Sequence, residues 1–176
     1  DAVRAFVETC RYPRNSMSVG DGVGRGTRGV GSEGTASIVW GIEPDNYIDI
    51  ADPWPLNPEG ELLLGLKIES VKGLENCERI LNVPGIGFAE MGPGDMSMSM
   101  GIIRKAGRGG MHDQDRRIID ARRRVNKACH DNGIAFLGHG SKEDIDKMID
   151  SGARVISGAD EEVAKIGRQY SQREMP

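Results

Sequence analysis

The chain has 176 residues, of which 28% are charged and 38% hydrophobic, a composition typical of folded rather than disordered proteins. Its 27 acidic and 23 basic residues leave a net charge of −4, which argues against nucleic acid or an anionic membrane as a partner. No apolar run reaches the ~18 residues of a membrane helix, and three widely spaced cysteines fit neither a disulfide framework nor a zinc site, so we expect a reducing cytoplasm.

The first sixty residues give weak signals for secondary structure. Apolar residues at helical spacing predict a short helix over residues 1–11, which Tyr12-Pro13 ends. The glycine-rich segment 14–37 is predicted to be a long loop. Segment 43–60 is broken by prolines and is predicted to be a connection, with a short helix around Tyr47 at most.

From residue 61 onward, strands and helices alternate. Short apolar runs predict strands over residues 61–69, 86–91, 134–137 and 153–157. Helical patterns occupy residues 70–81, 113–132, 141–150 and 159–170, with a helical turn over 96–101. This strict alternation predicts an α/β fold with a parallel sheet. Four strands fit either a small doubly wound sheet or half of an eight-stranded barrel.

Two carboxylates follow neighbouring strands of this sheet. Glu69 ends the first strand, and Asp95 comes just after the second. Because the carboxyl ends of parallel strands meet at one edge, we expect these side chains to converge there. Hard oxygen ligands suit Mg²⁺ or Mn²⁺, so the pair is a candidate metal site. Alternatively, each carboxylate only caps the helix that follows it.

Two further side chains near this edge are candidates for catalysis. Lys67 lies two residues before Glu69, so both point to the same face of a strand. We favour an ion pair or a substrate contact for Lys67 over a Schiff base with a keto acid, which would need an unprotonated amine. His139 lies between two glycines at a strand end, where it is either a general acid–base group or simply exposed.

The turn Gly92-Pro93-Gly94 joins the second strand to a helical turn. Open backbone N–H groups at such a helix start can hold a carboxylate or a phosphate. The alternative is an ordinary connection between a strand and a helix.

These segments together resemble a known enzyme family. The chain is similar to the metal-dependent class II aldolases of 2-oxo acids, the family of 4-hydroxy-2-oxoheptanedioate aldolase and 2-dehydro-3-deoxyglucarate aldolase. That family has Gln-Ile-Glu at the end of its fifth strand and Gly-Pro-Ala-Asp-Leu-Ser after its sixth. The matching segments here are Lys67-Ile68-Glu69, Met91 to Ser97, Ala5 to Glu8, Arg11-Tyr12-Pro13, Arg28 to Ser32 and Gly152 to Ile156.

The resemblance implies a (β/α)₈ TIM barrel, of which this chain supplies about the last four strands within one partial domain, residues 1–176. It implies that Glu69 and Asp95 bind the metal, Mg²⁺ or Mn²⁺ with Co²⁺ as a further candidate, which acts as a Lewis acid. It places the pyruvate carboxylate at the turn, on the backbone of Gly94 and Asp95, and Leu137 beside the substrate. The implied reaction cleaves a 4-hydroxy-2-oxo acid to pyruvate and an aldehyde, in the catabolism of aromatic compounds or sugar acids. Family members commonly form hexamers, so a homo-oligomer is expected.

Three departures from the family pattern leave other functions open. Lys67 replaces the usual glutamine, where its charge would repel a metal unless it is paired, and Gly94 replaces alanine. The family's catalytic histidine and arginine come from the first half of the barrel, so we expect this chain to be part of a longer protein or to assemble with another copy. The alternatives are a Schiff-base aldolase using Lys67, a truncated non-catalytic barrel subunit, and, more weakly, a lyase of acyl-CoA esters.

Overall fold

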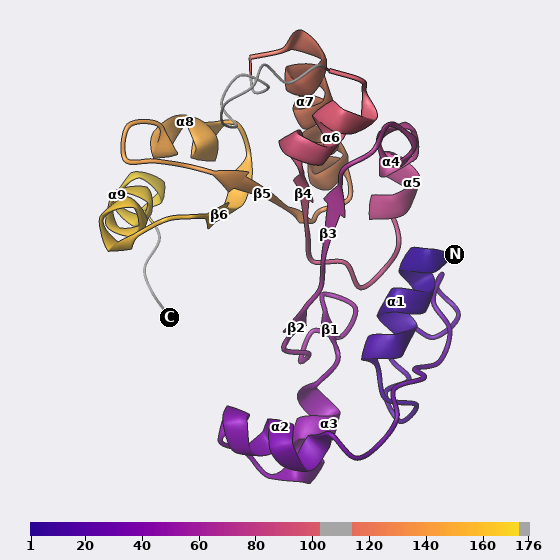
Figure 1. Cartoon of the computed structure of the whole chain (residues 1–176). Coiled ribbons are helices and arrows are strands. Elements are labelled where there is room, and N and C mark those ends of the chain that lie inside the picture. The colour runs from indigo at the N-terminus through magenta and orange to yellow at the C-terminus, as the bar shows by residue number, and fades with distance from the viewer. Residues whose placement is uncertain (103–113, 173–176) are drawn as a thin grey trace. The chain divides into compact units, whose positions relative to one another are not determined.

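The computed structural model describes residues 1–102 and 114–172 and separates into two compact units (Figure 1). The first unit contains Asp1–Leu66 and Arg79–Gly87, and the second contains Lys67–Glu78 and Phe88–Pro176. A single partial barrel domain over residues 1–176 therefore stays a prediction.

The first unit is organised around a buried ion pair. Its elements are α1 (Ala2–Cys10), α2 (Glu33–Trp40), α3 (Pro44–Ile50), β1 (Pro53–Trp54) and β2 (Leu62–Leu63). Arg11 directly follows α1, and its Nε lies 2.6 Å from Asp52 Oδ1, with both side chains fully buried. Nearby, the Arg28 guanidinium lies 4.6 Å above the ring of Tyr12 and also contacts Tyr47. Charge pairing thus supplements a small apolar core in this unit.

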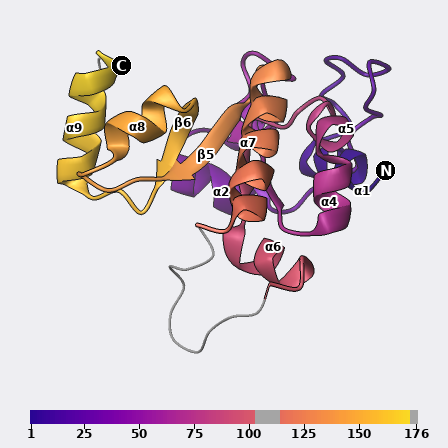
Figure 2. The same ribbon diagram turned by 90° about the horizontal axis from the view of Figure 1, so that it is seen from above.

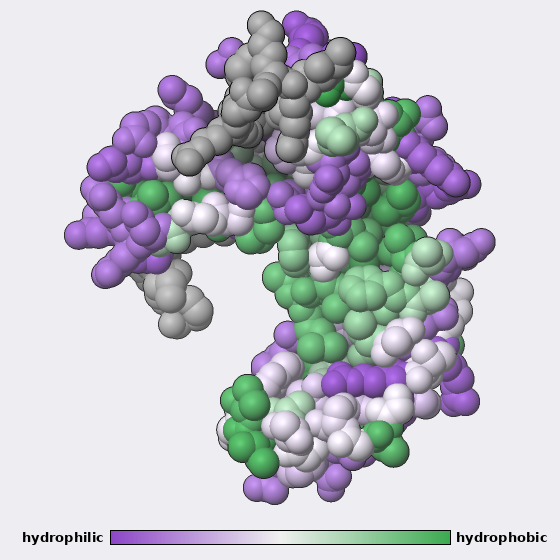
Figure 3. All heavy atoms as spheres, viewed as in Figure 1, coloured by the Kyte–Doolittle hydropathy of each residue, from purple (hydrophilic) through white to green (hydrophobic). Residues whose placement is uncertain are grey.

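Helix α2 corrects the prediction that residues 14–37 form one long loop. The helix begins at Glu33, which places an acidic side chain in its first turn, and it ends at Gly41 in the left-handed conformation. Its apolar residues Ile38 and Val39 are about 80% and 79% exposed. Because these side chains face outward, the sequence here lacks the inward periodicity by which a helix is predicted. Apolar atoms gather on the surface at α2 (Figure 3).

The proline-rich segment 43–60 also contains regular structure. Pro44 occupies the first turn of α3, where its missing N–H costs nothing, and the expected helix around Tyr47 is confirmed. The two residues of β1 pair in parallel with β2. Pro44 is the first residue of α3 and Pro53 is the first residue of β1, so these prolines do not prevent regular structure.

Within the described residues, the second unit is built on a four-stranded sheet in the order β3-β4-β5-β6. The strands are β3 (Gly65–Ile68), within which the boundary between the units falls, β4 (Phe88–Met91), β5 (Ala135–His139) and β6 (Ala153–Ser157). Strand β4 pairs in parallel with β5, and β5 with β6. The Gly92 N–H donates to the Ile68 carbonyl at the end of β3. The predicted α/β class with a parallel sheet is confirmed.

Helices alternate with these strands along the chain, as predicted from the sequence. They are α4 (Val71–Glu75), α5 (Cys77–Leu81), α6 (Pro93–Ser99), α7 (Arg116–Asp131), α8 (Ile145–Asp150) and α9 (Glu161–Ser171). Helix α7 packs on β4 and β5, and α8 packs on β6 and α9 (Figure 2). The buried face of α7 carries Ile118, Ala121 and Val125, as its apolar spacing requires.

Several boundaries differ from the prediction. The strand expected over 61–69 is divided at Leu64 between β2 and β3, and the helix expected over 70–81 breaks at Asn76. Helix α6 begins at Pro93 rather than Met96. Strand β5 continues to His139, which makes this histidine a strand residue. The expected start of α7 at Asp113 lies outside the described residues.

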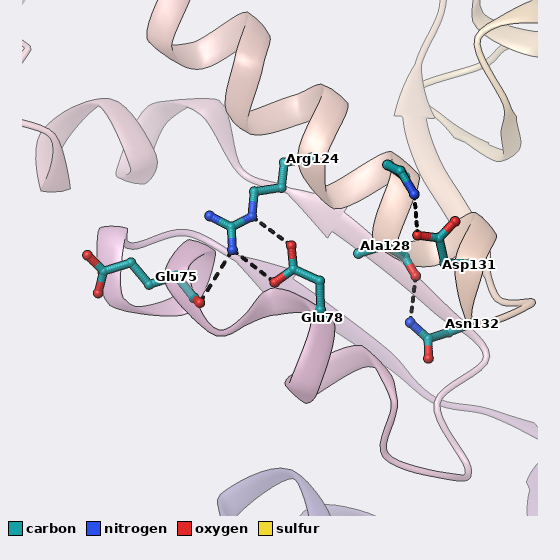
Figure 4. Close-up of polar contacts among 7 residues, drawn as sticks. Glu75, Glu78, Arg124, Ala128, Asp131 and Asn132 are labelled. Atoms are coloured by element: carbon teal, nitrogen blue, oxygen red, sulfur yellow. Dashed lines mark hydrogen bonds and ion pairs between the residues drawn. The ribbon is translucent and has the colours of Figure 1, made fainter.

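An ion pair joins α7 to the short helices before β4 (Figure 4). Arg124 Nε lies 2.7 Å from Glu78 Oε1, and its Nη2 also donates to the Glu75 carbonyl. This contact lowers the pKa of Glu78 to about 2, chiefly through the hydrogen bond from Arg124. Arg124 thus fixes α7 to the segment that carries the chain from β3 to β4.

Candidate functional site

Lys67 and Glu69 lie together at the carboxyl end of β3. Lys67 belongs to the strand, Glu69 follows its last residue, and their spacing of two puts them on one face. The Lys67 Nζ atom lies 3.0 Å from Glu69 Oε1, with the lysine side chain 53% exposed. The expected ion pair is confirmed.

Glu90 on β4 is a second acidic partner of Lys67, and the sequence analysis did not identify it. Its Oε2 atom lies 3.8 Å from Lys67 Nζ, and its side chain is only 14% exposed. The pKa of Lys67 is raised by the hydrogen bond to Glu69, then by the charge of Glu90, and further by that of Asp95. Glu90 is the only charged residue in the run 86–91, which was the signal available in the sequence.

His139 and Ser157 continue this row across the sheet. His139 Nε2 lies 3.0 Å from Glu90 Oε1, and its Nδ1 lies 2.7 Å from Ser157 Oγ. His139 on β5 pairs in register with Ser157 on β6. We call Lys67, Glu69, Glu90, His139 and Ser157 the polar row, because together they connect the ends of four neighbouring strands.

The turn after β4 leaves space for Glu69. Gly92 has no Cβ, and one placed there would lie 2.3 Å from Glu69 Oε1 and 2.7 Å from its Cγ. Pro93 then occupies the first position of α6, and Asp95 is an exposed acidic residue in the first turn. No side chain caps the start of this helix. Gly92 therefore fixes where the Glu69 carboxylate lies, next to the helix that carries Asp95.

The structure places only some of the remaining predicted site residues near the polar row. Leu137 pairs in register with Glu90, which places it next to the polar row. A cavity of about 340 Å³ is lined by Pro93, Leu137 and His139 among others, but neither Glu69 nor Lys67 lines it. The predicted substrate residues and the predicted metal ligands thus lie in one region without sharing one cavity.

The donor chemistry fits a hard divalent cation in part. Glu69 and Asp95 offer carboxylate oxygens, which Mg²⁺ and Mn²⁺ prefer, and Gly92 keeps room for one of them. Within residues 1–102 and 114–172, no group of three acidic, histidine or cysteine side chains is arranged to hold a metal ion. Two carboxylates suffice for Mg²⁺, because this ion keeps several water ligands. One of the two carboxylates, that of Glu69, is already in contact with Lys67.

No helix in the described part of the chain is both long and apolar enough to span a bilayer.

Comparison with known proteins gives a consistent family assignment. The model of the family HpcH/HpaI aldolase/citrate lyase matches residues 1–163. The chain is 31% identical over 157 residues to hydroxypyruvate/pyruvate aldolase of Delftia acidovorans, covering 89% of this chain and 49% of that protein. It is 35% identical over 116 residues to 2-keto-3-deoxy-L-rhamnonate aldolase of Salmonella schwarzengrund, covering 66% of this chain and 39% of that protein. The chain therefore spans half or less of the length of these curated relatives.

Solved structures agree on the fold. An HpcH/HpaI aldolase/citrate lyase family protein from Burkholderia cenocepacia matches with a TM-score of 0.68 and 20% identity, over 98% of this chain and 60% of that one. An HpcH/HpaI aldolase from Desulfitobacterium hafniense matches with a TM-score of 0.58 and 25% identity, over 85% of this chain and 49% of that one. The parallel sheet and its helices are thus consistent with a partial TIM barrel, and the chain belongs to the HpcH/HpaI aldolase/citrate lyase family.

Proposed function

We propose that this chain acts in the reversible aldol cleavage of a 4-hydroxy-2-oxo acid to pyruvate and an aldehyde, as a divalent-metal-dependent lyase. The observation that carries the proposal is the polar row beside the Gly92 turn, at the strand ends where barrel enzymes place their active sites. The aldolase names of both curated relatives support it. Because the chain spans only part of those relatives, other parts of a complete barrel would supply the remaining groups.

In this proposal Glu69 and Asp95 hold the metal, Mg²⁺ or Mn²⁺ with Co²⁺ as a further candidate. When bound, the metal supplies Lewis-acid polarisation of a 2-oxo acid. The Gly92-Pro93-Gly94 turn receives the substrate carboxylate on the N–H groups of Gly94 and Asp95.

The other residues orient the substrate and exchange protons. Leu137 packs beside the substrate, in register with Glu90. His139 would hold a proton at Nε2 against Glu90, which leaves Nδ1 and the Ser157 hydroxyl to exchange one with the substrate. A role in the catabolism of aromatic compounds or sugar acids in the cytoplasm belongs to the same proposal.

The contacts of Lys67 disfavour the alternative of a Schiff-base aldolase. Glu69 and Glu90 both raise the pKa of Lys67, so its amine stays protonated and is a poor nucleophile. A lysine that forms Schiff bases usually lies in an apolar or cationic environment, which lowers its pKa. We therefore assign Lys67 to charge balance and substrate contact.

We further propose that the protein assembles with copies of itself. Ile38 and Val39 on α2 form an exposed apolar surface that supports such a contact. Light scattering after size-exclusion chromatography should give a multiple of the chain mass. The same measurement on Ile38→Ser/Val39→Ser should give a smaller particle.

The activity is tested by pyruvate release from 4-hydroxy-2-oxo acids, followed through lactate dehydrogenase with Mg²⁺ present. Asp95→Asn should abolish pyruvate release, because it removes a charged ligand. Asp146→Asn is the matched control, since Asp146 also lies in the first turn of a short helix, α8, and should leave release unchanged. Equal activity of Asp95→Asn and the unmodified chain would refute the metal assignment. A folded chain that neither releases pyruvate nor binds Mn²⁺ would favour a non-catalytic barrel subunit.

A further inference from the structure

Lys67 and a metal ion would share the carboxylate of Glu69. The ammonium lies 3.0 Å from Glu69 Oε1, a hydrogen-bonding distance. Two cations on one carboxylate repel each other, because only a few ångströms separate them. A metal bound at Glu69 therefore favours movement of the ammonium away from this carboxylate.

Glu90 offers the ammonium a second position on the neighbouring strand. Its Oε2 lies 3.8 Å from Lys67 Nζ, so a shift of about 1 Å makes a direct charge-assisted hydrogen bond. The other oxygen of Glu90, Oε1, is held by His139 Nε2 at 3.0 Å, so the carboxylate presents one oxygen to each neighbour. Lys67 is half exposed and has a flexible stem, which permits this movement.

We propose that Lys67 is a resident cation that competes with the metal for Glu69, and that Glu90 receives the ammonium when the metal binds. The proposal rests on the metal site proposed above. It reconciles the lysine beside Glu69 with the proposed metal site. It also makes metal affinity adjustable, because the free energy of binding includes the cost of moving Lys67 from one carboxylate to the other.

The test measures Mn²⁺ binding to the whole chain from the electron paramagnetic resonance signal of the free ion, without substrate. Lys67→Gln should bind Mn²⁺ about tenfold more tightly than the unmodified chain, because the competing charge is gone. Lys127→Gln is the matched control. It removes an exposed lysine that is also ion-paired, to Asp131 on α7, and it should leave affinity unchanged.

Glu90→Gln separates the two roles of Glu90. With Lys67 present, the substitution should weaken Mn²⁺ binding, because the displaced ammonium loses its acceptor. In the Lys67→Gln background the weakening should be clearly smaller, because only the direct attraction between the Glu90 charge and the metal is then lost. Equal weakening in both backgrounds would mean that Glu90 contacts the metal itself, and it would overturn the proposed role of Glu90.

The outcomes also separate this proposal from the proposed function. Equal, measurable affinity of the unmodified chain and Lys67→Gln would refute the competition while leaving the metal site in place. Mn²⁺ binding by Lys67→Gln but not by the unmodified chain would support the competition, because Lys67 would then exclude the metal completely. Absence of binding in both folded proteins, as checked by circular dichroism, would refute the metal site and the competition together.

Discussion

Replacing Gly92 by alanine should inactivate the site while leaving the fold nearly intact. The added Cβ would lie 2.3 Å from Glu69 Oε1, 2.7 Å from its Cγ and 2.9 Å from its Cδ. An ordinary contact of about 3.4 Å therefore requires the carboxylate to move by about 1 Å, which breaks its contact with Lys67. The backbone of Gly92, at φ −78° and ψ 102°, suits alanine, so no strain arises there.

Gly92→Ala should change the free energy of unfolding only slightly and should reduce catalysis strongly. The ion pair between Lys67 and Glu69 is largely exposed, and its loss costs at most about 1 kcal/mol of unfolding free energy. Alanine at the N-cap of α6 costs roughly another 0.5–1 kcal/mol relative to glycine. A carboxylate misplaced by 1 Å, in contrast, can reduce catalysis about 100-fold.

Urea unfolding and the pyruvate-release assay measure these two quantities on the same preparation. Gly29→Ala is the matched control, because a Cβ added there would have no heavy atom within 4 Å. It should keep both activity and stability. Near-normal activity of Gly92→Ala, or its complete unfolding, would show that the position of Glu69 is not what Gly92 protects.

Three further predictions concern stability and reactivity. Asp52→Ala should lower the free energy of unfolding by about 3–5 kcal/mol in urea titrations, because it leaves the Arg11 charge buried without its partner; a loss below about 1 kcal/mol would contradict this. The pKa of Glu78 is about 2 in the folded chain and about 4.3 unfolded, so its pairing with Arg124 should stabilise the fold above pH ~4.5 and cease to do so as the pH falls toward 2. Since this pair is half exposed, the difference between the chain and Glu78→Gln should be at most about 1 kcal/mol at pH 7 and should vanish near pH 2; a difference that persists there would refute the assignment. Burial raises the pKa of Cys129 to about 12, so Ellman's reagent should modify this thiol only at the rate of unfolding, and fast modification in the native protein would be inconsistent with its burial.

Local sequence signals predicted the order of strands and helices in the second half of the chain. Short apolar runs separated by helical patterns predicted β4, β5 and β6, because strand and helix periodicities are properties of neighbouring residues. Helix α2 was missed because Ile38 and Val39 point outward. This part of the sequence therefore lacks the pattern of buried apolar residues by which a helix is predicted.

Some contacts of the site were predictable from neighbouring residues, and others depend on how the strands pair. The pairing of Lys67 with Glu69 was predictable from a spacing of two on one strand. Glu90 and Ser157 were not identified, because their contacts with Lys67 and His139 depend on the register between strands. Such a register is set by packing over the whole sheet and is not readable from any one segment.

The most direct test of the proposed aldolase function is exchange of the pyruvate methyl protons in D₂O, followed by proton NMR with Mg²⁺ present. Proton removal from pyruvate is the half-reaction that needs no aldehyde, so it isolates the chemistry assigned to the Gly92 turn and the polar row. The proposal predicts that the chain accelerates loss of the methyl signal and that Asp95→Asn does not, whereas Asp146→Asn does. Exchange at the buffer rate with a folded chain that also fails to bind Mn²⁺, or equal exchange with Asp95→Asn, would contradict it.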